Sequence, residues 1–381
     1  GDPFRRGMLR AVGVTGDALD LSGKLGGDRP TVLRVVVELS AVMTECNLLK
    51  NNLDVESAKM LAKIGTEKRI MLSGIKHDQK EANLAAQGLK PADGILIASD
   101  LAVSAVLTSL DLSENYMGPE GGKAIAAAIA DGNAVLKSLD LSYNRLDAEA
   151  GKALASAIAD GRSVLKKLNL DGYELNIEQL KGTDPVETLD LSVKRLDPAS
   201  GIVIAKCIEC NAVLTSLSLR SNGLDAEAGR ALASALAGNA VLKSLDLAGN
   251  ALCGIRFGKG TYDASGIQAL ASALAVNAVL TTIECAFRAR TRNLCLDSCT
   301  HAFSTLARSH QYPRLRPMCR SSRDMAIRGW LGCLPFGGDL PDTSPKTHLP
   351  DARSGRSRRS RRHPPEQTLQ TVPSRDTLDH P

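Results

Sequence analysis

The chain has 381 residues, of which 43% are hydrophobic and 23% charged, and its net charge is +5. This length allows one large domain or two to three domains of average size. The most apolar stretch, residues 31–43, contains Arg34 and Glu38, so the composition excludes a membrane-spanning helix of the usual kind.

The charge is divided between an acidic body and a basic tail. Residues 286–381 contain 17 basic and 8 acidic side chains, whereas residues 1–285 contain 30 and 34. The nine cysteines form no regular framework, which is typical of reduced thiols and favours a cytoplasmic protein, with the nucleus as the alternative compartment. The first residue is Gly1 rather than Met, which leaves a preceding segment open.

The amino-terminal part of the chain carries weak copies of a repeating unit. We interpret residues 1–41 as a degenerate repeat or cap, with a strand near residues 18–25. Further weak copies begin at Val42 (VMTECNLLKNNL) and Asp78 (DQKEANLAAQGL). The segment RIMLSGI at 69–75 also resembles a strand, but it lies too close to the next copy to belong to a full unit.

From residue 106 onward the repeat becomes regular. The string NAVLKSLDL at 133–141 returns unchanged at 239–247, and the pattern V-L-x-x-L-x-L recurs, in most copies, after about 28–29 residues. The interval that begins at Val164 is shorter than the others, and the one that begins at Val241 is longer. The copies begin at Val106, Val135, Val164, Pro185, Val213, Val241 and Val279.

Each regular unit predicts a short strand followed by a helix. Leu139 and Leu141 lie two residues apart and share one face of a strand, whereas Leu154 and Ile158 lie four apart, as on an amphipathic helix. Neither element buries its apolar face alone, so we expect the units to stack in parallel around one shared core. Asparagines recur after the strand, where they can satisfy backbone groups of the turn: Asn115, Asn144, Asn222 and Asn250. Glycines recur in the first helical turn, where they should let helix and sheet approach: Gly94, Gly122, Gly151, Gly201, Gly229 and Gly266.

These features resemble the leucine-rich repeat family, in its ribonuclease-inhibitor-like class. The pattern LxxLxLxxNxL, with its period of about 28–29 residues, covers positions 42–285. The resemblance implies an α/β solenoid, a horseshoe with a parallel inner sheet and outer helices. Two units depart from it, with Tyr173 and Lys194 in place of the asparagine. The unit that contains Tyr173 is short, because the next copy already begins at Pro185. We therefore expect its helical segment (ELNIEQLKGTDP) to form only a turn or loop.

The residues between the paired leucines should point outward on the concave face of the sheet. This column, with one residue of the neighbouring column, is the predicted partner-binding surface: Asp111, Asp140, Asn169, Asp190, Arg220, Asp246 and Glu284. Its carboxylates predict a shallow acidic groove for a basic partner, and the alternative is a solvated polar face that only keeps the sheet soluble. Because binding hot spots favour aromatic residues and arginine, Tyr143 and Phe287 are further candidates. An insertion at 253–262 adds Arg256, Phe257 and Lys259 as exposed loop candidates.

The motifs that would indicate chemistry do not fit. Cys207 and Cys210 have CxxC spacing, but both fall at small helix positions, so we interpret them as core residues rather than metal ligands. The insertion contains GIRFGKGT, which has too few residues between its glycines for a phosphate-binding loop. His77 is the sole histidine before residue 286, and no nucleophile motif accompanies it. The sequence therefore predicts no catalytic residue, no cofactor and no metal.

The repeat stops after Cys285. We expect a capping segment at 286–311 and a disordered basic tail at 312–381, rich in Pro, Arg and Ser. The run RSGRSRRSRRH at 353–363 could bind nucleic acid phosphates or direct nuclear import. A solvated tail and a mistaken gene model are the alternatives, since GC-rich DNA read in an unselected frame gives a similar mixture of residues.

The regular repeat without a catalytic constellation predicts a non-catalytic, monomeric scaffold that binds a protein partner on the concave face and has no contact with a membrane. One alternative is a regulator that stimulates a small GTPase, because Ran GTPase-activating proteins resemble this chain in their repeat length. That resemblance is at the level of the fold only and carries no functional residue with it. The second alternative is nucleic-acid binding through residues 353–363.

Overall fold

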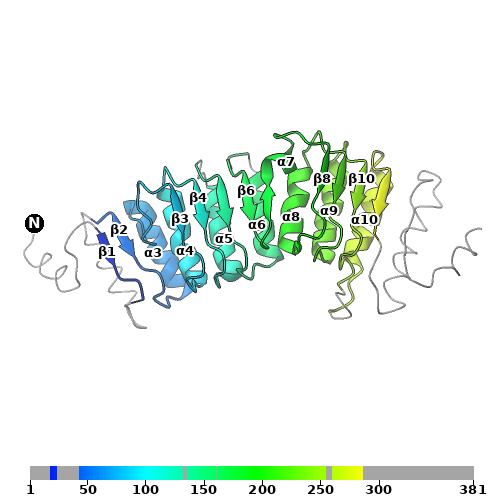
Figure 1. Cartoon of the computed structure of the whole chain (residues 1–381). Helices are drawn as coiled ribbons and strands as arrows, with labels where there is room; N and C mark the ends of the chain where they lie inside the picture. Colours follow the sequence, from blue (N-terminus) through cyan, green and yellow to red (C-terminus); the bar gives the residue numbers. More distant parts are fainter. Residues whose placement is uncertain (1–17, 24–42, 132–134, 160, 255–259, 286–381) are drawn as a thin grey trace, which may run out of the picture. The chain divides into compact units, whose positions relative to one another are not determined.

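The structure, a computed structural model, describes residues 18–23, 43–131, 135–159, 161–254 and 260–285. Within them, short strands alternate with helices along the chain (Figure 1). The strands are β1 (Ala18–Asp20), β2 (Glu45–Asn47), β3 (Glu81–Asn83), β4 (Ser109–Asp111), β5 (Ser138–Asp140), β6 (Lys167–Asn169), β7 (Glu174–Asn176), β8 (Thr188–Asp190), β9 (Ser216–Ser218), β10 (Ser244–Asp246) and β11 (Thr282–Glu284). The helices are α3 (Val55–Lys68), α4 (Pro91–Val103), α5 (Gly118–Ala130), α6 (Ala148–Ala159), α7 (Ile177–Lys181), α8 (Pro198–Ile208), α9 (Ala226–Gly238) and α10 (Ser265–Val276). None of these described helices has the length and apolar character needed to cross a bilayer.

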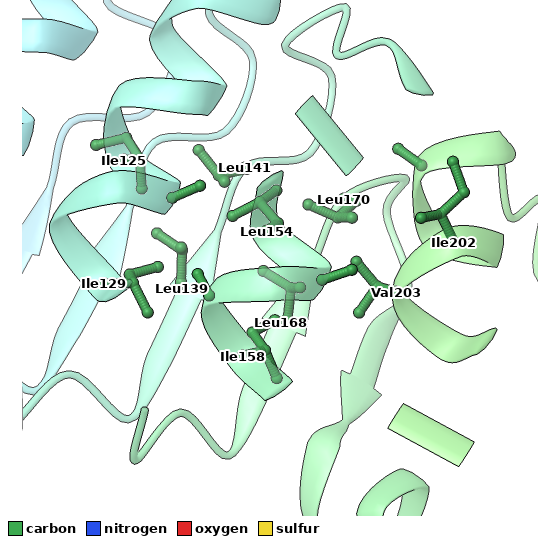
Figure 2. Packing of buried hydrophobic residues seen from close by; sticks show 14 of the residues in the cluster. Ile125, Ile129, Leu139, Leu141, Leu154, Ile158, Leu168, Leu170, Ile202 and Val203 are labelled. Carbon is green, nitrogen blue, oxygen red and sulfur yellow. The ribbon is translucent and has the colours of Figure 1, made fainter. Parts of the chain in front are cut away.

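The hydrophobic core lies between the strands and the helices and is shared by successive units. Leu139 of β5 packs in one cluster with Leu154 and Ile158 of α6, and each of these side chains is buried (Figure 2). The same cluster contains Ile125 of α5 and Leu168 of β6, which belong to the neighbouring units. Burying a side chain of this size contributes about 1.5–3 kcal/mol, and a separated unit would lose the part of this burial that its neighbours provide. The predicted shared core is confirmed.

Hydrogen bonds divide the strands into three sheets rather than one. β1 pairs with β2, β3 to β7 form a second sheet, and β8 to β11 form a third. All pairs are parallel except β6 with β7, which are antiparallel with Leu168 opposite Leu175. The predicted parallel arrangement is therefore confirmed for all described strand pairs except β6 with β7, and the strands fall into three hydrogen-bonded sheets.

The short unit explains the interruption between β7 and β8. Its length leaves no room for an ordinary helix, so the chain turns back along β6 as β7 and then forms only the five-residue α7. The predicted turn or loop is thus corrected to a strand and a short helix. The long helices on either side, α6 and α8, approach each other at Gly151 and Ala199, so the helix layer continues past α7.

The strand-like segment at 69–75 forms the other interruption. Met71 makes a parallel bridge to Glu45, and Leu72 accepts a hydrogen bond from the Leu48 N–H at 2.9 Å. No helix separates this segment from β3, as its short spacing predicts, and among the described strands β3 pairs only with β4. The N–H groups of Leu72 and Ser73 instead donate to the Asp100 carboxylate of α4, at 2.6 and 2.8 Å. A buried side chain thus takes the place of the missing neighbouring strand.

The asparagines after the strands connect each unit to the one before it, as predicted. Asn144 donates from Nδ2 to the carbonyls of Leu141 and Leu112, at 3.0 and 2.8 Å. Its Oδ1 accepts from the Met117 N–H of the preceding unit. Equivalent bonds are made by Asn51, Asn115, Asn222 and Asn250. Because these side chains are buried, each one satisfies backbone groups that water cannot reach.

A second row of asparagines precedes the strands and was not predicted. Asn239 accepts from the N–H groups of Val241 and Leu242 through Oδ1 and donates to the carbonyls of Ile208 and Asn211 through Nδ2. Asn211 and Asn277 bond in the same way. This row explains why the string NAVL is repeated. Its asparagine bonds the start of the strand that follows it to the end of the helix in the preceding unit.

The glycines of the first helical turn bring neighbouring helices together, rather than helix and sheet as predicted. A Cβ atom on Gly151 of α6 would lie 2.7 Å from the Ala199 Cα of α8. We therefore expect Gly151→Ala to lower the free energy of unfolding by about 2 kcal/mol, measured by urea denaturation. Gly238→Ala is the matched control, because its nearest non-local neighbour would lie 3.7 Å away, and it should be neutral or slightly stabilising. Equal losses in the two variants would contradict this explanation of the helix packing.

Candidate functional site

The outward side of the strands, called the sheet face below, carries the predicted column of polar residues. Leu110 is buried in β4 while its neighbours Ser109 and Asp111 are partly exposed, and most other strands repeat this alternation. The structure therefore brings the predicted residues of β4, β5 and β6 together on one sheet, and those of β8 to β11 on another.

Much of the polar column is engaged within the protein. Oδ1 of Asp111 accepts a hydrogen bond from the Ser113 N–H at 2.9 Å, which stabilises the turn after the strand. The same bond, from the backbone N–H two residues later, is accepted by Asp20, Asn47, Asn83, Asp140, Asp190 and Asp246. Bonds from Ser192 hold the pKa of Asp190 below its usual range, and the nearby charge of Lys194 adds to this effect. The alternative interpretation, a polar face with a structural role, thus gains support at these positions.

Side-chain partners on the sheet face engage further carboxylates. Asn169 donates to Oδ2 of Asp140 at 2.7 Å. Arg220, which follows β9, forms ion pairs with Asp246 of β10 at 3.5 Å and with Glu284 of β11 at 3.6 Å. The predicted acidic groove is therefore partly neutralised, most strongly near β9 to β11.

The turns that follow the strands form a second surface, called the exit edge below. In each turn, one residue has a left-handed backbone, and it lies four positions after the centre of the strand. This holds for every strand from β1 to β10 except β7, and the residues are Gly23, Lys50, Ala86, Glu114, Tyr143, Gly172, Val193, Ser221 and Gly249. This conformation turns the chain sharply and presents the side chain to solvent. Tyr143 and Val193 are 60% and 69% exposed, and Tyr116 two positions further along its turn is 55% exposed.

Aromatic rings and cations contact one another across successive units of this edge. The guanidinium of Arg145 lies over the Tyr116 ring, 4.9 Å from its centroid, and the ammonium of Lys194 lies 4.7 Å from the centroid of Tyr173. The Tyr143 hydroxyl lies against Gly172, where a Cβ atom would be only 2.5 Å away. Of these residues the sequence analysis proposed only Tyr143 for binding. The others could have been found from their shared position in the turn.

Tyr173 and Lys194 stand where other units have the buried asparagine. In those two units the turn has no asparagine to bond it to the preceding unit, and the two side chains contact each other instead. The two units that lack the asparagine lie on either side of the interruption between β7 and β8. Tyr173 is partly buried and packs against the core, so this ring–cation contact also joins the two units structurally.

Val193 is the most strained residue of the exit edge. Its φ of 57° is rare for any residue with a side chain and is a genuine outlier for a β-branched one. Because asparagine tolerates this conformation, we expect Val193→Asn to raise the free energy of unfolding by about 1 kcal/mol, measured by thermal or urea denaturation. Val164→Asn, at an exposed valine outside the left-handed region, should change stability by less than about 0.5 kcal/mol. A loss of stability in Val193→Asn would show that its side chain stabilises the fold.

The predicted core role of the CxxC cysteines is correct for Cys207 and wrong for Cys210. Cys207 is buried in α8, and desolvation raises the pKa of its thiol to about 12. Cys210 follows the helix and is exposed, beside a hollow of about 440 Å³ that opens between α6, α7 and α8. No group of three or more metal-ligating side chains occurs within the described residues. The expected set of reduced thiols also has an exception, because Cys253 is disulfide-bonded.

Several predicted residues cannot be placed. Arg256, Phe257 and Lys259 of the insertion lie outside the described residues, as do Phe287, the capping segment at 286–311 and the basic run at 353–363.

Comparisons with known proteins agree with the repeat seen in the fold. A family model described as leucine-rich repeat matches residues 103–126, 132–155 and 210–233. The chain contains leucine-rich repeats. Among solved structures, leiomodin-1 actin-binding site 2 is similar at 15% identity over 48% of this chain and 90% of that one, with a TM-score of 0.22. A search of curated proteins finds no match.

Proposed function

We propose that the protein is a non-catalytic scaffold whose leucine-rich repeats bind a protein partner on the sheet face and the adjoining exit edge. The observation that carries this proposal is the cluster of exposed large side chains at the exit edge, Tyr116, Tyr143 and Val193, beside a solvated polar sheet. Tyrosine and arginine dominate the energy of protein interfaces, and here they stand on turns of the same backbone conformation. A stack of units offers such a surface over several repeats at once.

The polar column contributes to this surface in a way that differs from the sequence prediction. Asp111 and Asp190 are hydrogen-bonded by serine side chains, whereas Asp140 accepts from Asn169, and Asp246 and Glu284 form ion pairs with Arg220. We expect these groups to orient a partner rather than to supply most of its affinity, because rim charges act mainly on association rate and specificity. Stimulation of a small GTPase and nucleic-acid binding through 353–363 stay predictions from the sequence.

The proposal is tested by blocking one side of the stack at a time. Ser138→Trp with Ser216→Trp places bulky side chains on the sheet face, and Ser156→Trp with Ser234→Trp places them on the exposed side of α6 and α9. Partners that cross-link to the full chain in its native lysate would be identified and then bound to each purified variant. We expect the sheet-face variant to bind them about tenfold more weakly or worse, and the helix-side variant to bind them normally. Loss of binding only in the helix-side variant would contradict the proposal.

A further inference from the structure

Six residues of the exit edge, called the exit row below, form one continuous feature across four units. They are Tyr116, Tyr143, Arg145, Tyr173, Val193 and Lys194. The row begins at the turn after β4 and ends at the turn after β8, so it spans the interruption between β7 and β8.

The two cations of the exit row lie over aromatic rings. Arg145 lies over Tyr116 and Lys194 lies over Tyr173, and no ion pair within 4 Å joins either cation to a carboxylate of the described residues. The charge of Lys194 nevertheless acts on the nearby Asp190 carboxylate and lowers its pKa. A ring restricts a cation without using its N–H donors, so the donors of the exposed Arg145 stay available to a ligand.

The turn of the repeat places large side chains of the exit row in solvent. Tyr143, Arg145 and Val193 all have positive φ values, between 57° and 58°. The same left-handed conformation occurs at Lys50, Ala86, Glu114 and Ser221 in other units, so it belongs to the turn itself. The exit row differs from those turns because Tyr143 and Val193 present large apolar side chains there, and both are exposed.

We propose that the exit row binds a protein segment that carries carboxylates next to an apolar side chain. This deepens the proposed function and rests on it. The carboxylates would pair with Arg145 and Lys194, to which the exposed Arg195 adds a third charge, while the apolar side chain would lie against Tyr143 and Val193. Carboxylate pairing suits arginine in particular, because its planar donors match both oxygens.

The geometry favours a protein over a nucleic acid. One face of the Tyr116 ring and one face of the Tyr173 ring are occupied by the stacked cations, so these faces are closed to the bases that would stack on an open ring.

Selection of peptides tests this inference directly. A displayed library of random short peptides would be selected on the full chain, and the survivors would be measured by fluorescence anisotropy in low and high salt. We expect the selected peptides to be enriched in Asp and Glu next to apolar residues, and to bind about tenfold more weakly to Arg145→Glu with Lys194→Glu. Lys137→Glu with Lys243→Glu is the matched control, since it makes the same change of charge at the turns before the strands and should leave binding intact. Circular dichroism would confirm that each variant is folded.

The other outcomes separate this inference from the proposed function. Peptides enriched in Lys and Arg, whose binding fails in Asp111→Asn with Asp190→Asn, would support a sheet-face scaffold and overturn the acidic-segment inference. Acidic peptides that bind the Arg145→Glu with Lys194→Glu variant normally would also overturn it. The same variants tested with single-stranded RNA and DNA should show no change in binding, and an RNA or DNA affinity lost with Arg145 and Lys194 would replace the protein partner by a nucleic acid. A library that yields no binder would contradict both proposals.

Discussion

We expect the free energy of unfolding to fall by about 4 kcal/mol as the pH rises from about 3 to about 8, because of one buried carboxyl group. Asp100 is completely buried, and this burial raises its pKa from 3.8 to about 7, although bonds from Ser73 and Leu72 act in the opposite direction. Between these pH values the folded protein keeps a proton that the unfolded chain has lost. Raising the pH therefore favours unfolding, and the loss is complete once the pH exceeds the pKa of the folded state.

Asp100→Asn isolates this contribution. Its single amide oxygen can accept from only one of the N–H groups of Leu72 and Ser73, which bond to different oxygens of the Asp100 carboxylate. The variant therefore loses a constant part of its stability at every pH, but it does not titrate. Exposed carboxyls with a lowered pKa, such as Asp54 and Asp263, act at lower pH in both proteins and cancel in the comparison. Urea denaturation across this pH range should show that the difference in stability between the two proteins changes by about 4 kcal/mol. An equal pH dependence in both would show that Asp100 does not titrate in this window.

The second large effect is expected at Asn222, the buried asparagine that follows the interruption. We expect Asn222→Ala to lower the free energy of unfolding by about 3 kcal/mol or more. Its Oδ1 accepts from the N–H groups of Lys194 and Leu196, at 3.0 and 3.1 Å. Its Nδ2 donates to the carbonyls of Leu191 and Leu219, at 2.8 and 2.9 Å. Alanine would leave these backbone groups buried without partners.

Asn83→Ala is the matched control for Asn222. Asn83 is exposed on β3 and accepts a hydrogen bond from the Ala85 N–H only. Its loss should lower stability by about 1 kcal/mol or less, measured in the same denaturation series. If Asn222→Ala cost no more than Asn83→Ala, the asparagine row would not be what joins the unit of β8 to the unit of β9.

The repeating part of the fold could be predicted because its physical requirements recur in every unit. Leu139 and Leu141 show the two-residue period of a strand, and Leu154 and Ile158 show the helical one. Since no unit buries both faces alone, this pattern leads to stacking, and the buried asparagines follow from the backbone groups of the turn. The second asparagine row was present in the string NAVL, but its bonds reach carbonyls of the preceding unit that sequence spacing alone does not reveal.

The interruptions could be predicted in position but not in form. The close spacing of the copies at Val164 and Pro185 indicates a shortened unit before β8, yet it does not show that β7 turns back along β6. Asp100 lies in an otherwise apolar helix, and its role depends on an earlier segment, around Ser73, that lacks a neighbouring strand. In both cases a contact that exists only in the folded chain determines the local structure.

The candidate site was predicted in part for a related reason. Alternation along the strands places Asp111, Asp140 and Asp190 outward, as the sequence indicates. It does not show that Asp140 and Asp246 are bonded to Asn169 and Arg220, because these partners come from other units. Of the exit row, Tyr143 was predicted as a binding residue and Tyr173 and Lys194 as departures from the repeat, but the row itself was not predicted, because its ring–cation contacts join different units.

The claim that the exit row is the binding surface is tested most directly by measuring its side chains in the bound state. Hydroxyl-radical footprinting of the full chain, resolved by tyrosine, would be compared with and without a selected acidic peptide. Tyr116 and Tyr143 are largely exposed in the free protein and should lose most of their labelling in the complex, while Tyr262, which is half-buried and outside the row, should be unchanged. Unchanged labelling of Tyr116 and Tyr143 in a saturated complex would place the partner elsewhere on the stack and contradict the account.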